Sequence, residues 1–163
     1  MLSKKVILTG SFGVGKTSLF NQFIHQVFSD KYLTTIGVKV NKKTINVNGR
    51  ELTILLWDIA GEVLQDKVPV SYFLGANGII YVFDLSRPST RMNMAEDLAY
   101  LEKLSPESVI KVVANKKDIV TSEELSKTLS ELPRPCDIVT SARTGENVEE
   151  LFQMMGELLL DQK

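Results

Sequence analysis

Residues 10–17 of this chain read Gly10, Ser11, Phe12, Gly13, Val14, Gly15, Lys16 and Thr17. They fit the pattern G-x-x-x-x-G-K-[ST], which occurs where a strand leads through a glycine-rich loop into a helix. The apolar residues 6–8 predict the strand, and the apolar residues of 19–24 recur at helical spacing. The flanking sequence therefore supplies the context in which this pattern forms a phosphate-binding loop. An ordinary glycine-rich turn is the alternative when the loop is taken alone.

The residue types of this loop suit the binding of phosphate groups. Its glycines allow the backbone to aim several N–H groups at phosphate oxygens, and the N-terminus of the following helix adds a favourable dipole. Lys16 is expected to reach the β- and γ-phosphates of a nucleotide, and the Thr17 hydroxyl is expected to bind Mg²⁺. The residues expected to hold the phosphates are Phe12, Gly13, Val14, Gly15, Lys16, Thr17 and Ser18.

The composition is that of one globular domain, which we expect to span residues 1–163. A net charge of -1 excludes a global electrostatic attraction to nucleic acid or to an anionic membrane. The single cysteine, Cys136, excludes an intramolecular disulfide. The first residues lack the apolar core of a signal peptide, so we expect a cytoplasmic protein. Leu2 excludes myristoylation and the last residues hold no cysteine for prenylation, so we expect no lipid anchor on this chain.

Apolar runs alternate with helical patterns along the chain, which predicts an α/β fold with a mostly parallel sheet. We expect strands near residues 4–9, 37–47, 51–58, 78–84, 109–114 and 136–140. We expect helices near residues 16–26, 64–75, 91–104, 122–131 and 147–160. Asn48 and Gly49 are typical of a type I′ hairpin turn, so one strand should run antiparallel to its neighbour. Ligands of such sheets bind at the carboxyl ends of the strands.

A short acidic motif follows the third expected strand, and it reads Asp58, Ile59, Ala60 and Gly61. An aspartate in this position can hold Mg²⁺, usually through water, and the N–H of Gly61 can meet a γ-phosphate. Aspartate followed by glycine is also common in turns, so the motif alone leaves both interpretations open.

The fifth expected strand is followed by Asn115, Lys116, Lys117 and Asp118. A carboxylate placed edge-on to guanine accepts hydrogen bonds from N1–H and from the 2-amino group, whereas adenine offers no such pair of donors. Asp118 is therefore expected to select guanine, with Asn115 connecting the loops and the stem of Lys116 covering the base. The sixth expected strand is followed by Ser141, Ala142 and Arg143, where the Ala142 N–H could donate to the guanine O6. Taken alone, either group would also suit an ordinary polar turn.

These motifs, in this order and spacing, resemble the Ras-like small GTPases, and most of all the Rab-type branch. The resemblance covers essentially the whole chain, including residues 35–37, 57–61 and 71–80. It implies a three-layer P-loop NTPase fold with a six-stranded, mostly parallel sheet, one antiparallel strand and five helices. It also implies GTP or GDP with Mg²⁺ as ligands, and two mobile segments near 29–38 and 60–73 that order when a γ-phosphate is present.

By the same resemblance, Phe28 packs against the base or ribose, Tyr32 lies over the phosphates, and Thr35 supplies a second hydroxyl to Mg²⁺. Core packing beside the first helix is the alternative for Phe28. The metal ligands implied are Thr17, Thr35 and Asp58. Effector and regulator proteins, including an exchange factor and an activating protein, are expected to bind through residues about 29–47 and 60–75.

Two residues depart from the family pattern. Glu62 stands where the family usually has a glutamine that positions the attacking water, and a carboxylate accepts from water but cannot donate. Phe12 stands where the family mostly has a small residue, and a ring that does not fold outward would crowd an external arginine. The segment near 29–38 holds no arginine of its own. We therefore predict slow unassisted hydrolysis, with catalytic roles for Lys16, Thr35, Gly61 and Glu62.

The sequence thus predicts a GTP-binding and GTP-hydrolysing molecular switch. A GTP-binding interaction module with negligible hydrolysis is the alternative from another class. An adenine-nucleotide enzyme with a phosphate loop is opposed by Asp118 and by the absence of any substrate-binding insertion in the sequence.

Overall fold

A computed structural model describes residues 2–31 and 35–162. Its sheet has six strands in the order β2-β3-β1-β4-β5-β6, in which β2 runs antiparallel to β3 and every other pairing is parallel. The predicted α/β fold, with its six strands and one antiparallel strand, is confirmed. The strands are β1 (Ser3–Gly10), β2 (Val38–Val47), β3 (Arg50–Ile59), β4 (Gly78–Asp84), β5 (Val109–Asn115) and β6 (Ile138–Val139).

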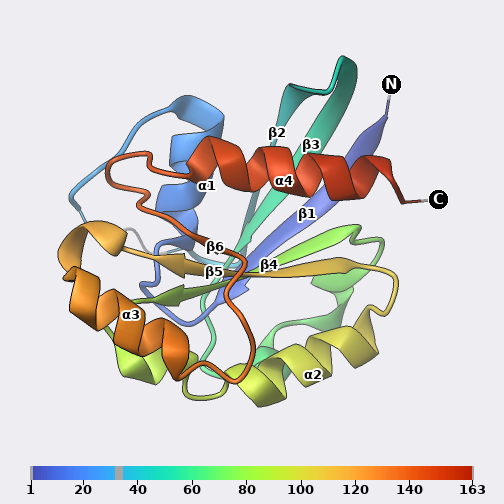
Figure 1. Ribbon diagram of the computed structural model, residues 1–163. Helices are drawn as coiled ribbons and strands as arrows, with labels where there is room; N and C mark the ends of the chain where they lie inside the picture. Colours follow the sequence, from blue (N-terminus) through green and yellow to red (C-terminus); the bar gives the residue numbers. More distant parts are fainter. Residues whose placement is uncertain (1, 32–34, 163) are drawn as a thin grey trace.

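Helices cover both faces of this sheet. The α-helices are α1 (Lys16–His25), α2 (Met94–Leu104), α3 (Ser122–Ser130) and α4 (Val148–Leu160). Figure 1 shows α1 and α4 on one face and α2 and α3 on the other. Alternate residues of β1 serve the two faces: Val6 and Leu8 belong to the buried cluster beneath α1 and α4, and Ile7 belongs to the cluster beneath α2. The strand is therefore apolar without interruption, as expected for a parallel sheet buried on both sides.

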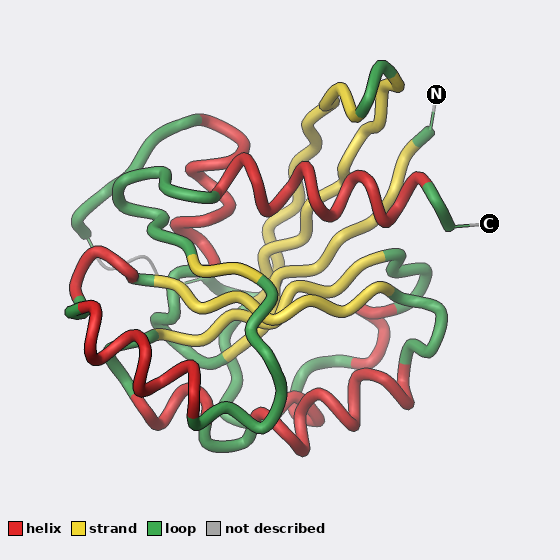
Figure 2. Tube along the Cα trace, viewed as in Figure 1, coloured by secondary structure: helices red, strands yellow, loops and turns green. Residues whose placement is uncertain are grey.

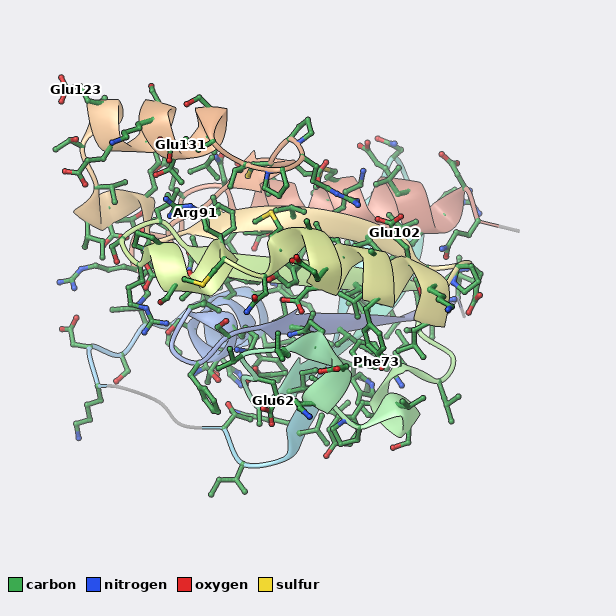
Figure 3. All side chains as sticks on the ribbon, turned by 90° about the horizontal axis from the view of Figure 1, so that it is seen from below. Glu62, Phe73, Arg91, Glu102, Glu123 and Glu131 are labelled. Atoms are coloured by element: carbon green, nitrogen blue, oxygen red, sulfur yellow. The ribbon has the colours of Figure 1, made fainter. Side chains whose placement is uncertain are left out.

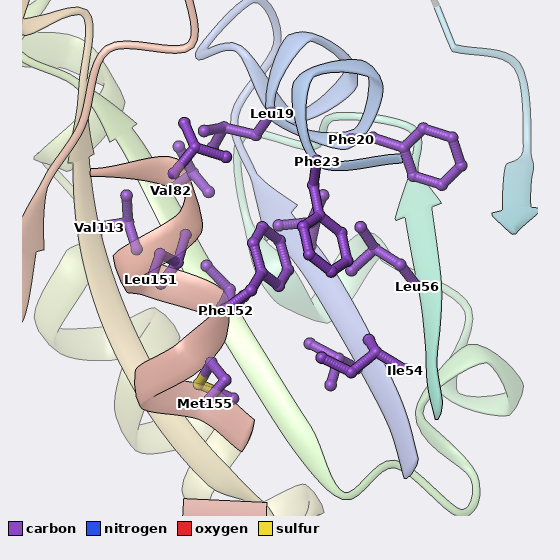
Figure 4. Close-up of a cluster of buried hydrophobic side chains, with 14 of the residues drawn as sticks. Leu19, Phe20, Phe23, Ile54, Leu56, Val82, Val113, Leu151, Phe152 and Met155 are labelled. Carbon is purple, nitrogen blue, oxygen red and sulfur yellow. The ribbon is translucent and has the colours of Figure 1, made fainter. Parts of the chain in front are cut away.

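Two stacked phenylalanines hold the first and last helices together. The rings of Phe23 in α1 and Phe152 in α4 lie with their centroids 3.7 Å apart and their planes within 14°. Figure 4 shows the two rings facing each other inside the cluster, close to Leu56 and Leu151. Such an aromatic pair contributes about 0.5–1.5 kcal/mol beyond the burial of its area. This packing fixes α1, whose first residue is Lys16, against the sheet.

The hairpin between β2 and β3 has the predicted turn. Asn48 and Gly49 have positive φ angles of 52° and 83°, as a type I′ turn requires. The Asn46 carboxamide accepts a hydrogen bond from the Gly49 N–H at 2.9 Å. The Asn-Gly pair thus closes the one antiparallel pairing, which extends from Val38 opposite Ile59 to Val47 opposite Arg50.

The α-helix expected at residues 64–75 is wrong. The structure has two short 3-10 turns there, η1 (Gln65–Lys67) and η2 (Val70–Phe73). Pro69 separates them, and Val68 before it is extended, with φ -75° and ψ 132°. A residue that precedes proline is disfavoured in the helical region, so the helix cannot continue through this position. The described residues therefore form four α-helices and not the expected five.

Two further 3-10 turns and the last strand also differ from expectation. A 3-10 turn, η3 (Pro88–Arg91), precedes α2, and η4 (Lys117–Ile119) follows β5. Strand β6 is shorter than predicted, because the Asp137 carboxylate accepts the Val112 N–H at 2.7 Å and ends the regular pairing. Figure 2 shows the strands twisting through the middle of the molecule between the two sets of helices. Across residues 2–31 and 35–162, each helix falls short of the length and apolar character that a membrane span requires.

Candidate nucleotide site

The carboxyl ends of the strands surround a cavity of about 310 Å³. The phosphate loop with the start of α1 contributes one wall, and the others come from the segment after α1 (residues 28–31 and 35) and from the loops after β3, β5 and β6. The predicted site residues that line it are Phe12, Gly13, Gly15, Lys16, Thr17, Ser18, Phe28, Thr35, Gly61, Asn115, Lys116, Asp118, Ala142 and Arg143. Residues from five separate stretches of the sequence therefore meet at one concave surface, where α/β sheets bind their ligands.

Among the predicted site residues that the structure describes, four stand apart from this lining. Val14 is fully buried in the core beneath α1, and only its carbonyl is engaged, as an acceptor for Asn115. Ser141 and Asp58 are fully buried behind residues that do line the cavity. Glu62 follows the lining residue Gly61 but is not part of the lining itself. Tyr32 lies outside the described residues.

Lys16 is held inside the phosphate loop. Its ammonium donates to the carbonyl of Ser11 at 2.6 Å and to that of Gly10 at 3.2 Å. Burial lowers the pKa of Lys16 to about 8; the charge of Asp58 opposes this shift and that of Arg87 adds to it. A cation that has lost most of its hydration is strongly stabilised by a nearby anion. The Lys16 ammonium therefore favours the binding of a phosphate group beside it.

Three oxygen-bearing side chains converge beside Lys16. The hydroxyl oxygens of Thr17 and Thr35 are 2.5 Å apart, and they lie 2.7 Å and 3.2 Å from Oδ2 of Asp58. Burial raises the pKa of Asp58, while the Thr17 hydrogen bond and the Lys16 charge act in the opposite direction. The second carboxylate oxygen, Oδ1, is buried and has no hydrogen-bond partner among the described residues.

This donor set fits Mg²⁺. A small hard cation takes oxygen ligands, commonly one or two from the protein, and completes its shell with phosphate oxygens and water. Two hydroxyls and one carboxylate meet that requirement, and the free oxygen of Asp58 offers a further acceptor for bound water. Among residues 2–31 and 35–162 no cluster of three or more His, Cys, Asp or Glu side chains is placed to hold a metal, which leaves this hydroxyl-rich group as the candidate.

Asn115 connects three loops at the opposite end of the cavity. Its Nδ2 donates to the Val14 carbonyl at 3.0 Å, and its Oδ1 accepts from the Thr140 hydroxyl at 2.9 Å and the Ala142 N–H at 3.1 Å. The side chain is buried. The Ala142 N–H, expected to be available to guanine, thus donates to Asn115 in this structure, and a bond to O6 would have to share this donor.

Asp118 and Lys116 are held by residues outside the cavity wall. The Ser141 hydroxyl donates to Oδ1 of Asp118 at 2.8 Å, which fixes one carboxylate oxygen and orients the other. The ammonium of Lys116 lies 2.9 Å from Oδ2 of Asp84, a fully buried carboxylate at the end of β4. Asp84 was not predicted as a site residue, although its place at the carboxyl end of a central strand was a signal for one.

Phe28 forms the outer edge of the cavity. Its ring is half-exposed, and the guanidinium carbon of Arg143 lies 5.7 Å from its centroid, within the range of a cation–π contact. Arg143 also pairs with Asp30 at 3.0 Å. The ring therefore belongs to the cavity wall, and core packing beside the first helix, the alternative interpretation, does not describe it.

The two segments expected to respond to a γ-phosphate touch each other. The Ala60 N–H donates to the Gly37 carbonyl at 2.9 Å, and the Glu62 N–H donates to the Gly10 carbonyl at 3.1 Å. A Cβ atom on Gly61 would come within 2.7 Å of backbone atoms of Phe12, so only glycine fits here. Figure 3 shows Glu62 on the same side of α2 as Phe73 and away from Glu123 of α3 and Glu131, which follows α3.

A buried polar network beneath residues 60–75 was missed from the sequence. The Gln65 N–H donates to Oδ1 of Asp97 at 3.0 Å, and the Tyr81 hydroxyl donates to Oδ2 of Asp97 at 2.7 Å. The Thr9 hydroxyl donates to the Gln65 carboxamide, and all four residues are buried. Asp97 falls among the apolar positions of α2, three residues after Met94 and four before Leu101, which was the available signal.

The site can now be compared with known proteins. A model of the Ras family matches residues 5–161. The chain is 32% identical over 160 residues to the Ras-related protein SEC4 of Saccharomyces cerevisiae, covering 95% of this chain and 74% of that protein. It is 33% identical over 156 residues to the Ras-related proteins Rab-1A (93% and 77% covered) and Rab-1D (93% and 76% covered) of Dictyostelium discoideum. The chain therefore belongs to the Ras family of small GTPases, and these relatives support its place in the Rab-type branch.

Proposed function

We propose that this chain is a molecular switch that binds GTP and GDP with Mg²⁺ and hydrolyses GTP slowly, and that residues 1–163 form one small GTPase domain. Members of the Ras family are GTP-binding switches in general. The observation that carries the proposal for this chain is Asn115, whose buried carboxamide joins the phosphate loop at Val14 to the loop of Ala142. One residue thus fixes the spacing between the phosphate end and the base end of a single cavity.

Guanine is the base that this cavity suits. With Oδ1 of Asp118 accepting from Ser141, the carboxylate is held at a fixed orientation beside Asn115 and Lys116. A fixed carboxylate discriminates strongly, because a base without matching donors leaves it desolvated and unpaired. Phe28 and the stem of Lys116 offer apolar surface to the two faces of the base. These contacts support a preference for guanine over adenine nucleotides.

The switching step is proposed to depend on Thr35 and Gly61. Thr35 brings a hydroxyl to Asp58 from one segment, and Gly61 brings its backbone close to that of Phe12 from the other. The hydrogen bond between Ala60 and Gly37 couples the two segments. A γ-phosphate with its Mg²⁺ would bind both groups at once, whereas GDP offers no group at that position, so the two nucleotides favour different populations of these segments.

Slow hydrolysis is proposed from the position and chemistry of Glu62. Lys16 and Thr35 supply charge and metal binding, and Gly61 supplies an N–H, but Glu62 would have to orient the attacking water. Its carboxylate cannot donate a hydrogen bond, and it carries negative charge toward a negatively charged phosphate. Glu62 also lies outside the cavity lining, which favours the second candidate function, a GTP-binding interaction module with negligible hydrolysis.

Single-turnover hydrolysis separates these two functions. The purified chain is loaded with GTP and Mg²⁺, and GDP formation is followed over hours by chromatography. We expect a rate far below about 1 s⁻¹, the lower end of ordinary enzymatic turnover. A rate near or above that value contradicts slow intrinsic hydrolysis. GTP that stays intact over days, with binding preserved, selects the interaction module.

Residues 29–47 and 60–75 are proposed to bind effectors and regulators, as Ras-family proteins do in general. Both segments carry large apolar side chains in solvent: Ile36 is 92% exposed and Leu74 is 68% exposed. Exposed apolar residues that gather on one face commonly mark protein interaction sites. The further apolar residues exposed on these segments are Val40, Val63, Leu64 and Val70.

A cytoplasmic location stays part of the proposal. The free thiol of Cys136 is half-buried and its sulfur contacts the carbonyls of Val112 and Ile138. Burial raises the pKa of this thiol, which keeps it unreactive. A single unpaired cysteine of this kind suits a reducing compartment.

A further inference from the structure

Arg87 lies against the outer side of the phosphate loop. It is the third residue after the end of β4, and its guanidinium donates through Nη2 to the carbonyl of Phe12. Its Nε lies 3.4 Å from Oδ2 of the buried Asp84. The planar fork of arginine can serve these two acceptors at the same time, which the single ammonium of lysine cannot do with equal geometry.

The turn that carries Arg87 is firmly built. The Arg87 N–H donates to the Asp84 carbonyl at 3.1 Å, and the Arg87 carbonyl accepts from the Thr90 N–H at 3.0 Å and from the Thr90 hydroxyl at 2.8 Å. The Thr90 hydroxyl oxygen also accepts from the Asp84 N–H at 2.9 Å. Pro88 follows directly and restricts Arg87 to extended backbone angles, with φ -126° and ψ 97°. The guanidinium thus starts from a fixed backbone position.

The carbonyl that Arg87 holds determines where the next N–H points. The peptide bond between Phe12 and Gly13 is trans, as are all those described. In a planar trans peptide the C=O and the following N–H point in opposite directions. With the Phe12 carbonyl directed at Arg87, the Gly13 N–H is directed away from it, toward the cavity that Phe12 and Gly13 line. Gly61, the residue proposed to meet the γ-phosphate, packs against the preceding peptide, between Ser11 and Phe12.

We propose that Arg87 is a positioning residue for GTP hydrolysis, which fixes the peptide between Phe12 and Gly13 so that the Gly13 N–H is aimed at the transferred phosphate; this rests on the proposed function. Asp84 is the link between the two ends of the site. Its Oδ2 forms ion pairs with Lys116 of the base end at 2.9 Å and with Arg87 of the phosphate end at 3.4 Å. Binding of the base and orientation of the phosphate loop are therefore connected through one buried carboxylate.

The position of Arg87 is relevant to one feature of the sequence already described. Segment 29–38 holds no arginine, whereas Arg87 reaches Phe12 in the phosphate loop. Arg87 supplies a permanent positive charge beside the same residue from within the chain. A preorganised N–H acts where negative charge develops in the transition state, so its orientation affects the rate more than it affects the binding of GDP.

The test compares Arg87→Ala and Arg87→Lys with the wild-type chain. Arg134→Ala is the matched control, because it also removes one half-exposed arginine, but from an ion pair with Glu102 away from the cavity. Single-turnover GTP hydrolysis is measured together with the affinities for GDP and for a non-hydrolysable GTP analogue. Thermal unfolding of each variant reports on folding.

We expect Arg87→Ala to slow hydrolysis roughly ten- to a hundredfold, as when a catalytic group is displaced by about 1 Å. The affinity for GDP should stay within about threefold of the wild-type value. Arg87→Lys recovers part of the rate because it keeps the charge without the fork. Arg134→Ala matches the wild type. An unchanged rate in Arg87→Ala overturns the proposal, and so does a loss of GDP affinity as large as the loss of rate, which would indicate a merely structural role.

Failure of the proposed function gives a different pattern. If the wild-type chain binds GTP without measurable turnover, the two affinities decide: Arg87→Ala should then weaken the GTP analogue several-fold relative to GDP. Equal effects on both nucleotides overturn the role of Arg87. If the wild-type chain binds no guanine nucleotide, the proposed function fails and the inference on Arg87 fails with it.

Discussion

Thr17 and Thr35, which come from α1 and from the segment that leads into β2, place their hydroxyl oxygens 2.5 Å apart on the same oxygen of Asp58. Two neutral hydroxyls and one carboxylate leave room for a cation to accept phosphate and water ligands as well. Because Asp58 is fully buried, its contact with Thr35 also anchors residue 35 to the core of the site. The geometry therefore joins the proposed Mg²⁺ ligands Thr17 and Asp58 to Thr35, which belongs to one of the two segments expected to respond to a γ-phosphate.

Removal of Mg²⁺ is expected to speed the release of GDP about ten- to a hundredfold, because charge-assisted contacts of about 1.5–3 kcal/mol are lost. Dissociation of a fluorescent GDP is followed with Mg²⁺ and with EDTA. Thr17→Ala should show fast release in both conditions, whereas Thr35→Ser, which keeps the hydroxyl, should respond to Mg²⁺ as the wild type does. Release that is insensitive to EDTA contradicts the assignment of the metal ligands.

Asp118→Asn is expected to weaken GDP binding about ten- to a hundredfold, because each lost donor–acceptor pair on a base edge costs about 1–3 kcal/mol. The amide offers a donor where xanthine presents an oxygen, so xanthosine diphosphate should bind the variant better than the wild type. Competition against fluorescent GDP measures both changes. Glu131→Gln, an exposed charge on the end of α3, is the control and should leave the preference intact.

Gly61→Ala is expected to weaken binding of a GTP analogue about five- to a hundredfold relative to GDP. The new methyl group would come 2.7 Å from backbone atoms of Phe12, and it can be accommodated only by moving residue 61 away from the phosphate loop. Affinities for the two nucleotides, measured on one protein preparation, give the ratio. A ratio equal to that of the wild type removes Gly61 from γ-phosphate recognition.

As the pH rises from 4 to 7, the free energy of unfolding of the wild type is expected to fall relative to that of Asp97→Asn. Burial raises the pKa of the Asp97 carboxyl, partly opposed by its hydrogen bonds from Gln65 and Tyr81. The folded state thus favours the protonated form, and the wild type loses stability as the pH rises from the ordinary carboxyl value through the raised one. Asparagine has no proton to lose, and it can accept from Gln65 and donate to Tyr81.

Urea unfolding of both proteins at several pH values measures this difference. A tenfold difference in proton affinity between the folded and unfolded states corresponds to about 1.4 kcal/mol. Glu123→Gln, which removes an exposed carboxylate of α3, is the control for the loss of a surface charge. A pH-independent difference between Asp97→Asn and the wild type contradicts the role of burial at Asp97.

The phosphate loop was predictable because its eight residues determine their own backbone. Glycines allow its turns, and the spacing of the apolar residues indicates the strand before it and the helix after it. The base end was predictable for a different reason. Parallel strands carry their carboxyl ends to one edge, so the polar residues after β3 and β5 had to meet there. The cavity lining brings together Lys16, Asn115 and Asp118 as this rule requires.

The contacts of Arg87 and Asp97 could not be read from the sequence. Arg87 donates to a backbone carbonyl 75 residues earlier in the chain. Every residue has such a carbonyl, so the sequence does not indicate which one accepts the hydrogen bond. Asp97 binds a backbone N–H of residue 65 and a hydroxyl of residue 81, which depend on how residues 60–75 fold. That segment was itself misjudged, because its apolar residues have helical spacing while Pro69 prevents a helix. Tertiary contacts and one proline override the local pattern here.

Competition between GTP and ATP for the purified chain, in the presence of Mg²⁺, is the most direct test of the account. Fluorescent GDP is displaced by increasing amounts of each nucleotide, and the two half-displacement concentrations are compared. A carboxylate that the wrong base would cover and leave unpaired rejects that base by roughly 10⁴-fold, so GTP should displace the probe at concentrations at least about a thousandfold lower than ATP. Displacement by ATP at concentrations similar to those of GTP, or failure of the chain to bind the GDP probe, would contradict it.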